Sequence, residues 1–440
     1  MRRLIRIAVS LLVVLAVAAA GAYAWATRYP EIAAIARPNA AAFDKETVRR
    51  GEQLAGYGNC HVCHTRPGGR PFAGGLPLPT PFGVIHTTNI TPDVETGIGA
   101  WSEQAFIRAM REGVDRHGRH LYPAFPYDYY TKVTDADLKA IYAFLMTRPP
   151  VSQAVPENTL GFPFNIRPLL AGWKLLFHAP GEFKEDPGKD KEWNRGAYLV
   201  EGLGHCGACH TPRNRFGAAP KSGAEAYAGA VVEGWYAPPL NAHAAGAVPW
   251  TQKTLVNYLI DGWDEHHGIA AGPMTPVVDD LAEQNEDDVF AIAAYVVSLK
   301  GGARPSAEQE SATTAAVAAA TKLEWGHAEA PPVPSDPLQQ RGAKVFESQC
   351  TTCHKAGGKP VPLALTATVN AVDAGGLIAV TLHGIKPPRG SLDRSMPARA
   401  IQISDEEMAA LAAFVRARYT KKPAWTGVQE QSKNIRAAGK

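Results

Sequence analysis

The sequence predicts a mainly α-helical protein in which three similar domains follow one N-terminal apolar helix. Two observations support this prediction. A motif of two cysteines and a histidine occurs three times, each time after a short amphipathic segment and before a longer helical pattern. Glycine and proline are plentiful, at 41 and 35 residues, which favours loop-rich domains over long bundles. The net charge of +3 gives no indication of a nucleic-acid partner.

Residues 1–30 combine a basic start with a long apolar run. Three arginines precede the run 7–26, which is long enough to cross a bilayer as a helix and would keep its basic end in the cytoplasm. The competing interpretation is a cleaved signal peptide, because the tripeptide AYA at 22–24 resembles a cleavage site. We expect a retained transmembrane anchor. Both interpretations export the rest of the chain.

All six cysteines belong to the motifs CHVCH, CGACH and CTTCH. In a c-type haem, each thiol bonds a porphyrin vinyl group and the adjacent histidine binds the iron. A zinc ribbon needs two CxxC pairs close together, and a thioredoxin-like site needs only one. We therefore expect three covalently bound haem c groups and no disulfide. The thiols are Cys60, Cys63, Cys206, Cys209, Cys350 and Cys353, and the proximal iron ligands are His64, His210 and His354.

The motifs lie in a repeat. RGEQLAGYGNCHVCH, RGAYLVEGLGHCGACH and RGAKVFESQCTTCH all begin with Arg-Gly, and a second helical pattern follows each, at 134–148, 286–300 and 404–419. The last pattern begins with a capping box of Ser404 and Glu407. Aromatic residues recur in these patterns, at Tyr142, Tyr295 and Phe414. A first helix with small residues that crosses a last helix with aromatic residues resembles the cytochrome c fold, here repeated three times.

The domain boundaries follow from this repeat. We expect cytochrome c domains at 44–150, 190–302 and 337–420, after the anchor or signal segment 1–30. The connector 151–189 contains the apolar stretch 160–177, which is too short to span a membrane. It could lie on the bilayer, dock on a partner or pack between domains. The Ala/Pro-rich linker 303–336 carries no recognisable chemistry, and we expect the polar tail 421–440 to be loose.

Two methionines are suited to bind iron on the face opposite the proximal histidine. Met274 and Met396 each lie in a proline-bearing loop between a CxxCH motif and the helical pattern that follows it. We expect both to be distal ligands. Met110, Met146 and Met408 lie inside helical patterns, where we expect them to fill the core.

The first domain has Phe125 at the corresponding position, and phenylalanine cannot bind iron. We expect His120 as the distal ligand, with His117 or His86 as alternatives. A further alternative is a five-coordinate iron with Phe125 packed over an open site. The basic loop around His117 and His120 is also compatible with a solvated surface loop. His61 is too close to its own motif to bind the distal face.

With these motifs in view, the chain resembles the tri-haem cytochrome c subunit of bacterial membrane-bound dehydrogenases. This family includes the cytochrome subunits of alcohol, gluconate and aldehyde dehydrogenases, and of molybdenum hydroxylases such as nicotinate or isoquinoline oxidoreductases. The specific segments are TTNITPDVETGIGAWS (87–102), LYPAFPY (121–127), WNRGAYLVEGLGHCGACHTPRN (193–214) and GPMTPVV (272–278). Family members typically carry methionine at the position of Phe125. The phenylalanine version resembles the subgroup of the molybdenum hydroxylases.

The resemblance implies an electron relay and no catalysis by this chain itself. A catalytic subunit, which is a molybdenum hydroxylase, a quinoprotein or a flavoprotein, would pass single electrons to the haems. Ubiquinone or a terminal oxidase would accept them, and the haem domains would lie in the periplasm on the inner membrane. Two other functions remain open from the residues: a peroxidase-like enzyme with an open first haem, and a free periplasmic electron shuttle.

Overall fold

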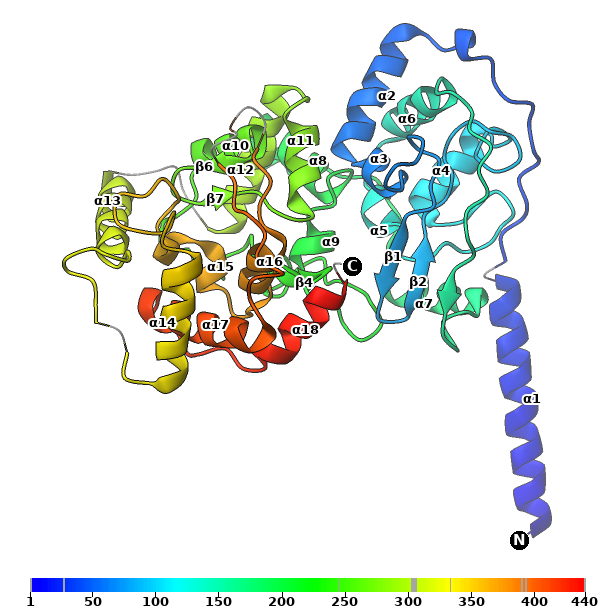
Figure 1. The fold of residues 1–440 in the computed structure, drawn as a ribbon. Helices are drawn as coiled ribbons and strands as arrows, with labels where there is room; N and C mark the ends of the chain where they lie inside the picture. Colours follow the sequence, from blue (N-terminus) through cyan, green and yellow to red (C-terminus); the bar gives the residue numbers. More distant parts are fainter. Residues whose placement is uncertain are drawn as a thin grey trace. The chain divides into compact units, whose positions relative to one another are not determined.

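The computed structural model describes residues 2–26, 28–244, 246–301, 307–332, 334–388, 391 and 394–438. The chain forms two compact units, Met1–Ala55 with Cys60–Phe183, and Gly56–Asn59 with Lys184–Lys440. Both are mainly helical, which confirms the mainly α-helical part of the predicted fold class (Figure 1). The helices up to residue 183 are α1 (Arg2–Ala26), α2 (Lys45–Tyr57), α3 (Cys60–Cys63), α4 (Glu103–Glu112), α5 (Tyr127–Tyr130), α6 (Asp135–Met146) and α7 (Leu170–Phe177), with short 3-10 turns at Ala40–Ala42 and Arg167–Leu169.

The second half of the chain is also built from helices. They are α8 (Lys191–Glu201), α9 (Gly207–His210), α10 (Gln252–Asp261), α11 (Met274–Leu281), α12 (Glu286–Leu299), α13 (Ala307–Lys322), α14 (Pro337–Gln349), α15 (Ala367–Asn370), α16 (Gly375–His383), α17 (Asp405–Tyr419) and α18 (Val428–Ala438), with a 3-10 turn at Leu363–Leu365.

Short antiparallel strands connect these helices. The first unit contains the sheet β1 (Pro77–Thr80), β2 (Gly83–His86) and β3 (Thr159–Leu160), in that order. The second unit contains the hairpins β4 (Ala230–Val232) with β5 (Trp235–Ala237), and β6 (Trp263–Asp264) with β7 (Gly268–Ile269). Each pairing is only a few residues long, so the helices supply most of the core.

The same helix crossing occurs three times, as the repeat predicts. In each case a glycine of the Arg-Gly pair approaches a backbone carbonyl of the later helix so closely that a Cβ atom would overlap it. The pairs are Gly51 with Ala140, Gly196 with Ala291, and Gly342 with Ala410. Figure 1 shows the last of these crossings, α14 with α17. The glycine therefore recurs because the two helix backbones touch at that point.

The arginine of the repeat also has a structural role. Arg50 donates from Nε to Oδ1 of Asp137 at 2.8 Å, and Arg195 donates to Oδ1 of Asp288 at 2.6 Å. Both aspartates lie near the start of the later helix. These ion pairs tie the first helix to the N-terminal turns of the last one, where a carboxylate is also favoured by the helix dipole.

The aromatic repeat requires one correction. The aromatic side chain four residues after the contacted alanine is Phe144 in the first crossing, and Tyr295 and Phe414 in the others. The assignment of Tyr142 to this position is therefore wrong. Tyr142 instead donates its hydroxyl to the Trp101 carbonyl at 2.8 Å. Both aromatic residues lie on α6, and only the crossing point shows which of them faces the first helix.

Gly342→Ala should lower the free energy of unfolding of the second unit by about 1–3 kcal/mol, the usual cost of overpacking. The new Cβ would meet the Ala410 carbonyl, which is backbone and cannot rotate away. Thermal unfolding of the haem-loaded chain measures the effect. Gly188→Ala is the control, because its Cβ would meet only the side chain of Asp186. Equal unfolding temperatures for Gly342→Ala and the wild type would contradict the crossing geometry.

The expected linker 303–336 is largely part of the fold. Residues 302–306 lie outside the described part of the chain, but α13 follows them. Trp325 packs into the core around Phe346 and Phe414 of the last crossing, which we call the third core. The Trp325 ring centroid lies 5.8 Å from that of Phe346 and 6.0 Å from that of Phe414. Buried Glu324 accepts the backbone N–H of Leu363 at 3.0 Å. The linker thus supplies core and polar contacts that its composition does not indicate.

The tail is not loose, and that expectation is wrong for residues 428–438. They form α18, whose Val428 and Ile435 are buried. Ser432 donates its hydroxyl to Asp405 at 2.6 Å, and Arg436 donates from Nε to the same carboxylate at 3.0 Å. The two apolar residues are seven positions apart, so they lie on one face of the helix. Most of the tail is polar because the other faces are exposed.

Glu324→Gln should flatten the dependence of stability on pH in the second unit. Burial raises the pKa of Glu324, so the folded chain holds this proton more tightly than the unfolded chain. Between the ordinary carboxyl pKa and the raised pKa of Glu324, the unfolded state binds fewer protons than the folded state. The wild type therefore loses stability as the pH rises between these two values. Unfolding temperatures between about pH 4 and pH 7 test this, since ordinary glutamates titrate near pH 4.

Glu329→Gln is the matched control for this measurement. The hydrogen bond from Lys322 lowers the pKa of Glu329, so its contribution is present above its ordinary pKa and is lost on acidification. Glu329→Gln should therefore leave the slope above the ordinary carboxyl pKa unchanged and reduce only the loss of stability on acidification below it. A steeper loss of stability with rising pH in Glu324→Gln would overturn the assignment.

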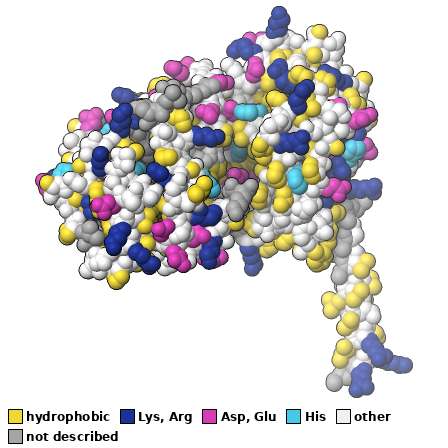
Figure 2. Space-filling view, viewed as in Figure 1, with side chains coloured by type: hydrophobic (Ala, Val, Ile, Leu, Met, Phe, Trp, Pro, Cys, Tyr) yellow, Lys and Arg dark blue, Asp and Glu magenta, His cyan; other side chains and the backbone are white. Residues whose placement is uncertain are grey.

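The N-terminal helix α1 exposes apolar side chains along its length, for example Leu12 at 66% and Val17 at 66%. Figure 2 shows these side chains, with basic side chains gathered at the start of the helix. Within the described residues, however, no helix meets the length and apolarity needed to cross a bilayer. The predicted transmembrane helix is therefore not supported.

Residues 151–183 of the connector 151–189 pack within the first unit, and residues 184–189 belong to the second. Its strand β3 pairs with β2, and Lys174 of α7 donates to the carbonyls of Glu112 and Gly113 at 2.6 Å each. The apolar stretch 160–177 nevertheless leaves Phe162, Leu175 and Leu176 exposed at 81%, 70% and 75%. Packing accounts for one face of this stretch, and the other face presents a hydrophobic surface.

Candidate haem sites

The first CxxCH motif forms a compact turn with an oriented histidine. Cys60–Cys63 is the short helix α3, and Asn59 precedes it with a positive φ of 49°. The Nδ1 atom of His64 lies 2.6 Å from the Thr88 carbonyl oxygen, and since a carbonyl only accepts, Nδ1 carries the proton. Metal-binding histidines commonly donate one ring N–H to a carbonyl in this way. The other nitrogen, Nε2, is then the one suited to iron.

The second motif repeats this geometry. His205 has a positive φ of 35° before the first cysteine, and Nδ1 of His210 donates to the Pro238 carbonyl at 2.7 Å. In both motifs the carbonyl of the proximal histidine accepts an N–H from a positive-φ glycine at 2.8 Å. These glycines are Gly74 for His64 and Gly229 for His210. The returning loop therefore fixes the position of each histidine from two sides.

The carbonyls of Thr88 and Pro238 are functional groups that sequence reasoning missed. They are backbone atoms, so no side-chain signal marks them. Thr88 does lie in the segment TTNITPDVETGIGAWS, where Asn89 donates to the Val151 carbonyl at 2.8 Å and accepts the hydroxyl of Thr91 at 2.8 Å. This buried network holds the loop that carries the Thr88 carbonyl.

Burial favours the neutral form of all three proximal histidines. It lowers the pKa of His64, His210 and His354 below the ordinary value for imidazole. Neutral imidazole is the form that binds a metal ion. The six cysteines, all of which lie in the described part of the chain, are free of disulfides. Each motif thus offers two thiols and one neutral imidazole, the donor set of a covalent haem c.

A half-buried carboxylate lies beside the second motif, and no sequence pattern indicates it. Glu201 accepts the hydroxyls of Tyr227 and Tyr295, both at 2.6 Å on the same oxygen. Burial raises the pKa of both tyrosines, and the charge of Glu201 next to them adds to this. The cluster lies near Cys206, because burial and then the charge of Glu201 raise the pKa of this thiol.

The third motif follows α14 directly. The amide of Cys350 donates to the Phe346 carbonyl at 2.8 Å, and that of His354 donates to the Cys350 carbonyl at 2.9 Å. Burial raises the pKa of the Cys350 thiol to about 11. The positive charge of nearby Arg399 opposes this rise. Arg399 is three residues after Met396. This places the predicted ligand loop next to the third motif.

The two predicted methionine ligands lie in fixed turns. Met274 is the first residue of α11, and its amide donates to the Ala271 carbonyl at 3.3 Å. Met396 pairs with Ile385 through two backbone hydrogen bonds, at 2.8 and 3.0 Å. Met274 is half-buried. Their role as iron ligands stays a prediction. Met110, Met146 and Met408 are buried in the core, which confirms the prediction made for them.

In the first unit, Phe125 lies close to the cysteine motif. Its ring centroid is 5.3 Å from that of Tyr130. Tyr130 is buried, and the charges of Cys60 and Cys63 contribute to raising its pKa, so it lies near both thiols. Phe125 lies two residues before the short helix α5, whereas Met274 is the first residue of α11. Phe125 thus lies near the first motif, and its correspondence to a methionine ligand stays a prediction.

His120 takes part in a buried polar cluster with α7. Nζ of Lys174 lies 3.1 Å from His120 Nδ1 and donates to two backbone carbonyls, of Glu112 and Gly113. Burial lowers the pKa of Lys174 to about 7, and below that pH the three protons of its ammonium match these three acceptors, which leaves the His120 proton on Nε2. Tyr29 packs edge-on against the ring at 5.6 Å. A protonated Nε2 cannot bind iron, so this arrangement favours a structural role for His120.

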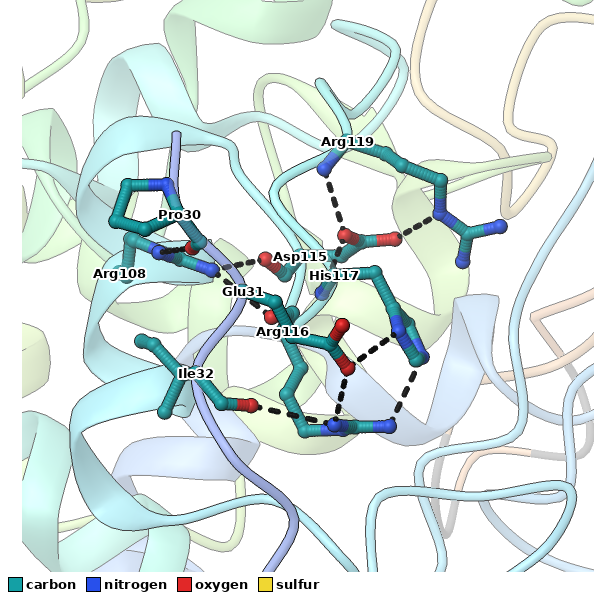
Figure 3. Close-up of polar contacts among 8 residues, drawn as sticks. All are labelled: Pro30, Glu31, Ile32, Arg108, Asp115, Arg116, His117 and Arg119. Carbon is teal, nitrogen blue, oxygen red and sulfur yellow. Dashed lines mark hydrogen bonds and ion pairs between the residues drawn. The ribbon is translucent and has the colours of Figure 1, made fainter. Parts of the chain in front are cut away.

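The other candidate histidines also have polar partners. Figure 3 shows Nδ1 of His117 next to Glu31 at 3.1 Å, in a cluster where Arg116 also pairs with Glu31 at 3.0 Å. This cluster fastens the segment after α1 to the loop 115–119. Nδ1 of His86 lies 3.1 Å from the Glu157 carbonyl oxygen. His117 and His86 thus each make a polar contact with another segment of the first unit.

Comparisons with known proteins agree with this geometry. A family model described as cytochrome c matches residues 48–149, and one described as cytochrome c oxidase, cbb3-type, subunit III matches residues 337–415. A nicotinate dehydrogenase subunit of Pseudomonas putida is 45% identical over 414 residues, which cover 92% of this chain but 33% of that protein. The chain thus spans about a third of the length of this relative.

Two further relatives are covered nearly end to end. The gluconate 2-dehydrogenase cytochrome c subunit of Pantoea cypripedii is 37% identical over 84% of this chain and 85% of its own length. The fructose dehydrogenase cytochrome subunit of Gluconobacter japonicus is 35% identical over 92% of this chain and 85% of its own length. The chain therefore belongs to the family of cytochrome c subunits of dehydrogenases, and it is an electron-transfer component rather than a catalytic enzyme.

Proposed function

We propose that this chain is a three-haem relay that accepts single electrons from a dehydrogenase catalytic subunit and passes them to ubiquinone or a terminal oxidase. The observation that carries the proposal is the threefold repeat of one structural unit, in which a CxxCH motif follows a helix crossing fixed by glycine. The haems supply the one-electron chemistry, while the chain provides thiols, axial ligands and burial.

The catalytic partner that fits best is a molybdenum hydroxylase. The support is Phe125, which resembles the version of this loop found with such enzymes, together with the 45% identity to the nicotinate dehydrogenase subunit. A quinoprotein or flavoprotein partner is the alternative, since relatives named for gluconate and fructose dehydrogenases match as well.

We further propose that the haem domains lie in the periplasm and that the N-terminal segment associates with the inner membrane. The support is the basic start of the chain followed by exposed apolar side chains of α1, and the exposed apolar residues of 160–177. A basic end before an apolar stretch favours a cytoplasmic start and export of the downstream domains.

The test has two steps. Purified native complex should contain three covalent haems per chain by pyridine haemochromogen assay and by mass, and molybdenum by metal analysis. Addition of the partner's substrate should then reduce the haems. Two haems or fewer per chain would overturn the relay as proposed, and a quinone or flavin in place of molybdenum would reassign the partner.

The same preparation separates the two competing functions. A peroxidase-like enzyme would turn over peroxide and bind carbon monoxide at one reduced haem, with loss of activity on blocking that haem. A free shuttle would be found in the soluble periplasmic fraction without a partner. We expect neither peroxide turnover nor a partner-free soluble pool.

A further inference from the structure

The indole ring of Trp235 contacts segments near both predicted methionine ligands within one compact unit. Trp235 begins β5, is half-buried and packs against the third core. Gly272 approaches the ring so closely that a Cβ there would overlap it. The ring centroid of His383, the last residue of α16, lies 6.1 Å from that of Trp235 at an angle of 38°.

Each of the two neighbours of this ring is connected through a short piece of backbone to a predicted iron ligand. Gly272 is two residues before Met274 and has a positive φ of 56°, which lets the loop turn against the indole. On the other side, α16 runs into Ile385, which pairs with Met396 through two backbone hydrogen bonds. Trp235 therefore touches the loop that carries one predicted methionine ligand and the helix that leads to the other.

The strand that holds Trp235 also leads to the proximal side of the second site. It continues directly into Pro238, whose carbonyl accepts from His210 at 2.7 Å. Tyr236, the next residue, packs against Gly376 of α16, where a Cβ would lie 3.3 Å from the Tyr236 Cβ. One short strand thus connects the histidine of one site with the helix that leads to the ligand loop of the other.

Two further contacts hold the loops together. The guanidinium carbon of Arg394 lies 3.3 Å from the ring centroid of Trp263, a cation–π contact. A Cβ at Gly262 would lie 3.0 Å from the Pro388 Cβ. Both contacts join the hairpin that precedes Met274 to the loop that carries Met396. The two sites therefore share a packed interface at their methionine sides.

We propose that Trp235 is a positioning residue for electron exchange between the second and third haems. This inference rests on the proposed function, because it requires a haem at both sites. Electron tunnelling depends on the separation of the two centres and on packed atoms between them. Removal of the indole leaves a void, whose lining atoms lose their contacts, and it frees the two ligand loops to separate. Exchange between these two haems then slows while each haem keeps its own ligands.

The experiment uses the purified full chain with its haems. Trp235→Leu is combined with Met396→His, which gives the third haem a distinct spectrum and potential. Substoichiometric photoreduction followed by time-resolved absorbance then measures redistribution of electrons between the second and third haems. Trp235→Leu should slow this phase several-fold relative to Met396→His alone. Haem content and midpoint potentials should not change, which separates the effect from a loss of folding or of ligation.

Trp425→Leu in the same background is the matched control. Trp425 is also a half-buried tryptophan of this unit, but it donates to the Ala371 carbonyl at 3.1 Å inside the third core. If Trp235→Leu fails to retain haem, Arg394→Gln tests the same interface through its cation–π contact. Three haems with an unchanged redistribution rate in the retained variant overturn this inference alone. Fewer than three haems in the unsubstituted chain overturn the proposed relay itself.

Discussion

Phe125→Met should raise the midpoint potential of the first haem and leave the other two unchanged. Phe125 lies beside Tyr130, near Cys60 and Cys63, and its distance in sequence from His64 is similar to that of Met274 from His210. A methionine sulfur at this position can bind the iron, and methionine ligation raises the potential of a histidine-bound haem. Axial ligands tune haem potentials over a range of about 0.8 V, so this is the largest effect expected from a single side chain.

Potentiometric titration with EPR of the oxidised protein measures this change. The first haem should become a low-spin histidine–methionine centre. Phe82→Met is the control, because the Phe82 ring centroid lies 4.4 Å from that of Phe164, a contact that involves no ligand loop. Identical potentials in Phe125→Met and the wild type would show that the loop does not face the iron.

His120→Ala completes this experiment. Because the contact with Lys174 places the His120 proton on Nε2, we expect no change in the haem spectrum and a lower unfolding temperature of the first unit. His117→Ala should likewise leave the spectrum intact, since its ring pairs with Glu31 (Figure 3). A change of spin state in His120→Ala would restore the sequence prediction that this residue binds iron.

Met274→His and Met396→His should each lower the midpoint potential of one haem. Each methionine is held in a fixed turn, Met274 at the start of α11 and Met396 in its pairing with Ile385. Exchange of a sulfur ligand for an imidazole removes the rise in potential that methionine provides. Potentiometric titration should show a different haem shifted in each variant, with haem content unchanged.

Met408→Leu is the control for both variants. Met408 is fully buried in the third core, and leucine replaces methionine in cores at low cost. No potential should move in this variant. If Met274→His or Met396→His also leaves every potential in place, the corresponding ligand assignment is wrong.

Much of the site could be predicted from the sequence because covalent haem attachment needs a fixed local spacing. The cysteines and the following histidine lie within five residues, so the pattern is visible without the fold. The helix crossings could also be anticipated from the Arg-Gly repeat, because close backbone contact requires glycine and leaves a recurring signal. The aromatic partner in the first crossing could not be chosen, since Tyr142 and Phe144 lie on the same helix.

The sequence by itself determined the helical class, the cysteine–histidine motifs and the repeat, since all of these depend on residues close together in the chain. The tertiary structure alone decided which groups meet across long separations. In the folded chain the Thr88 and Pro238 carbonyls accept hydrogen bonds from His64 and His210. His120 contacts Lys174, and Trp325 and α18 pack against the third core. Backbone acceptors and long-range contacts leave no local pattern, because what selects them is the packing of distant segments.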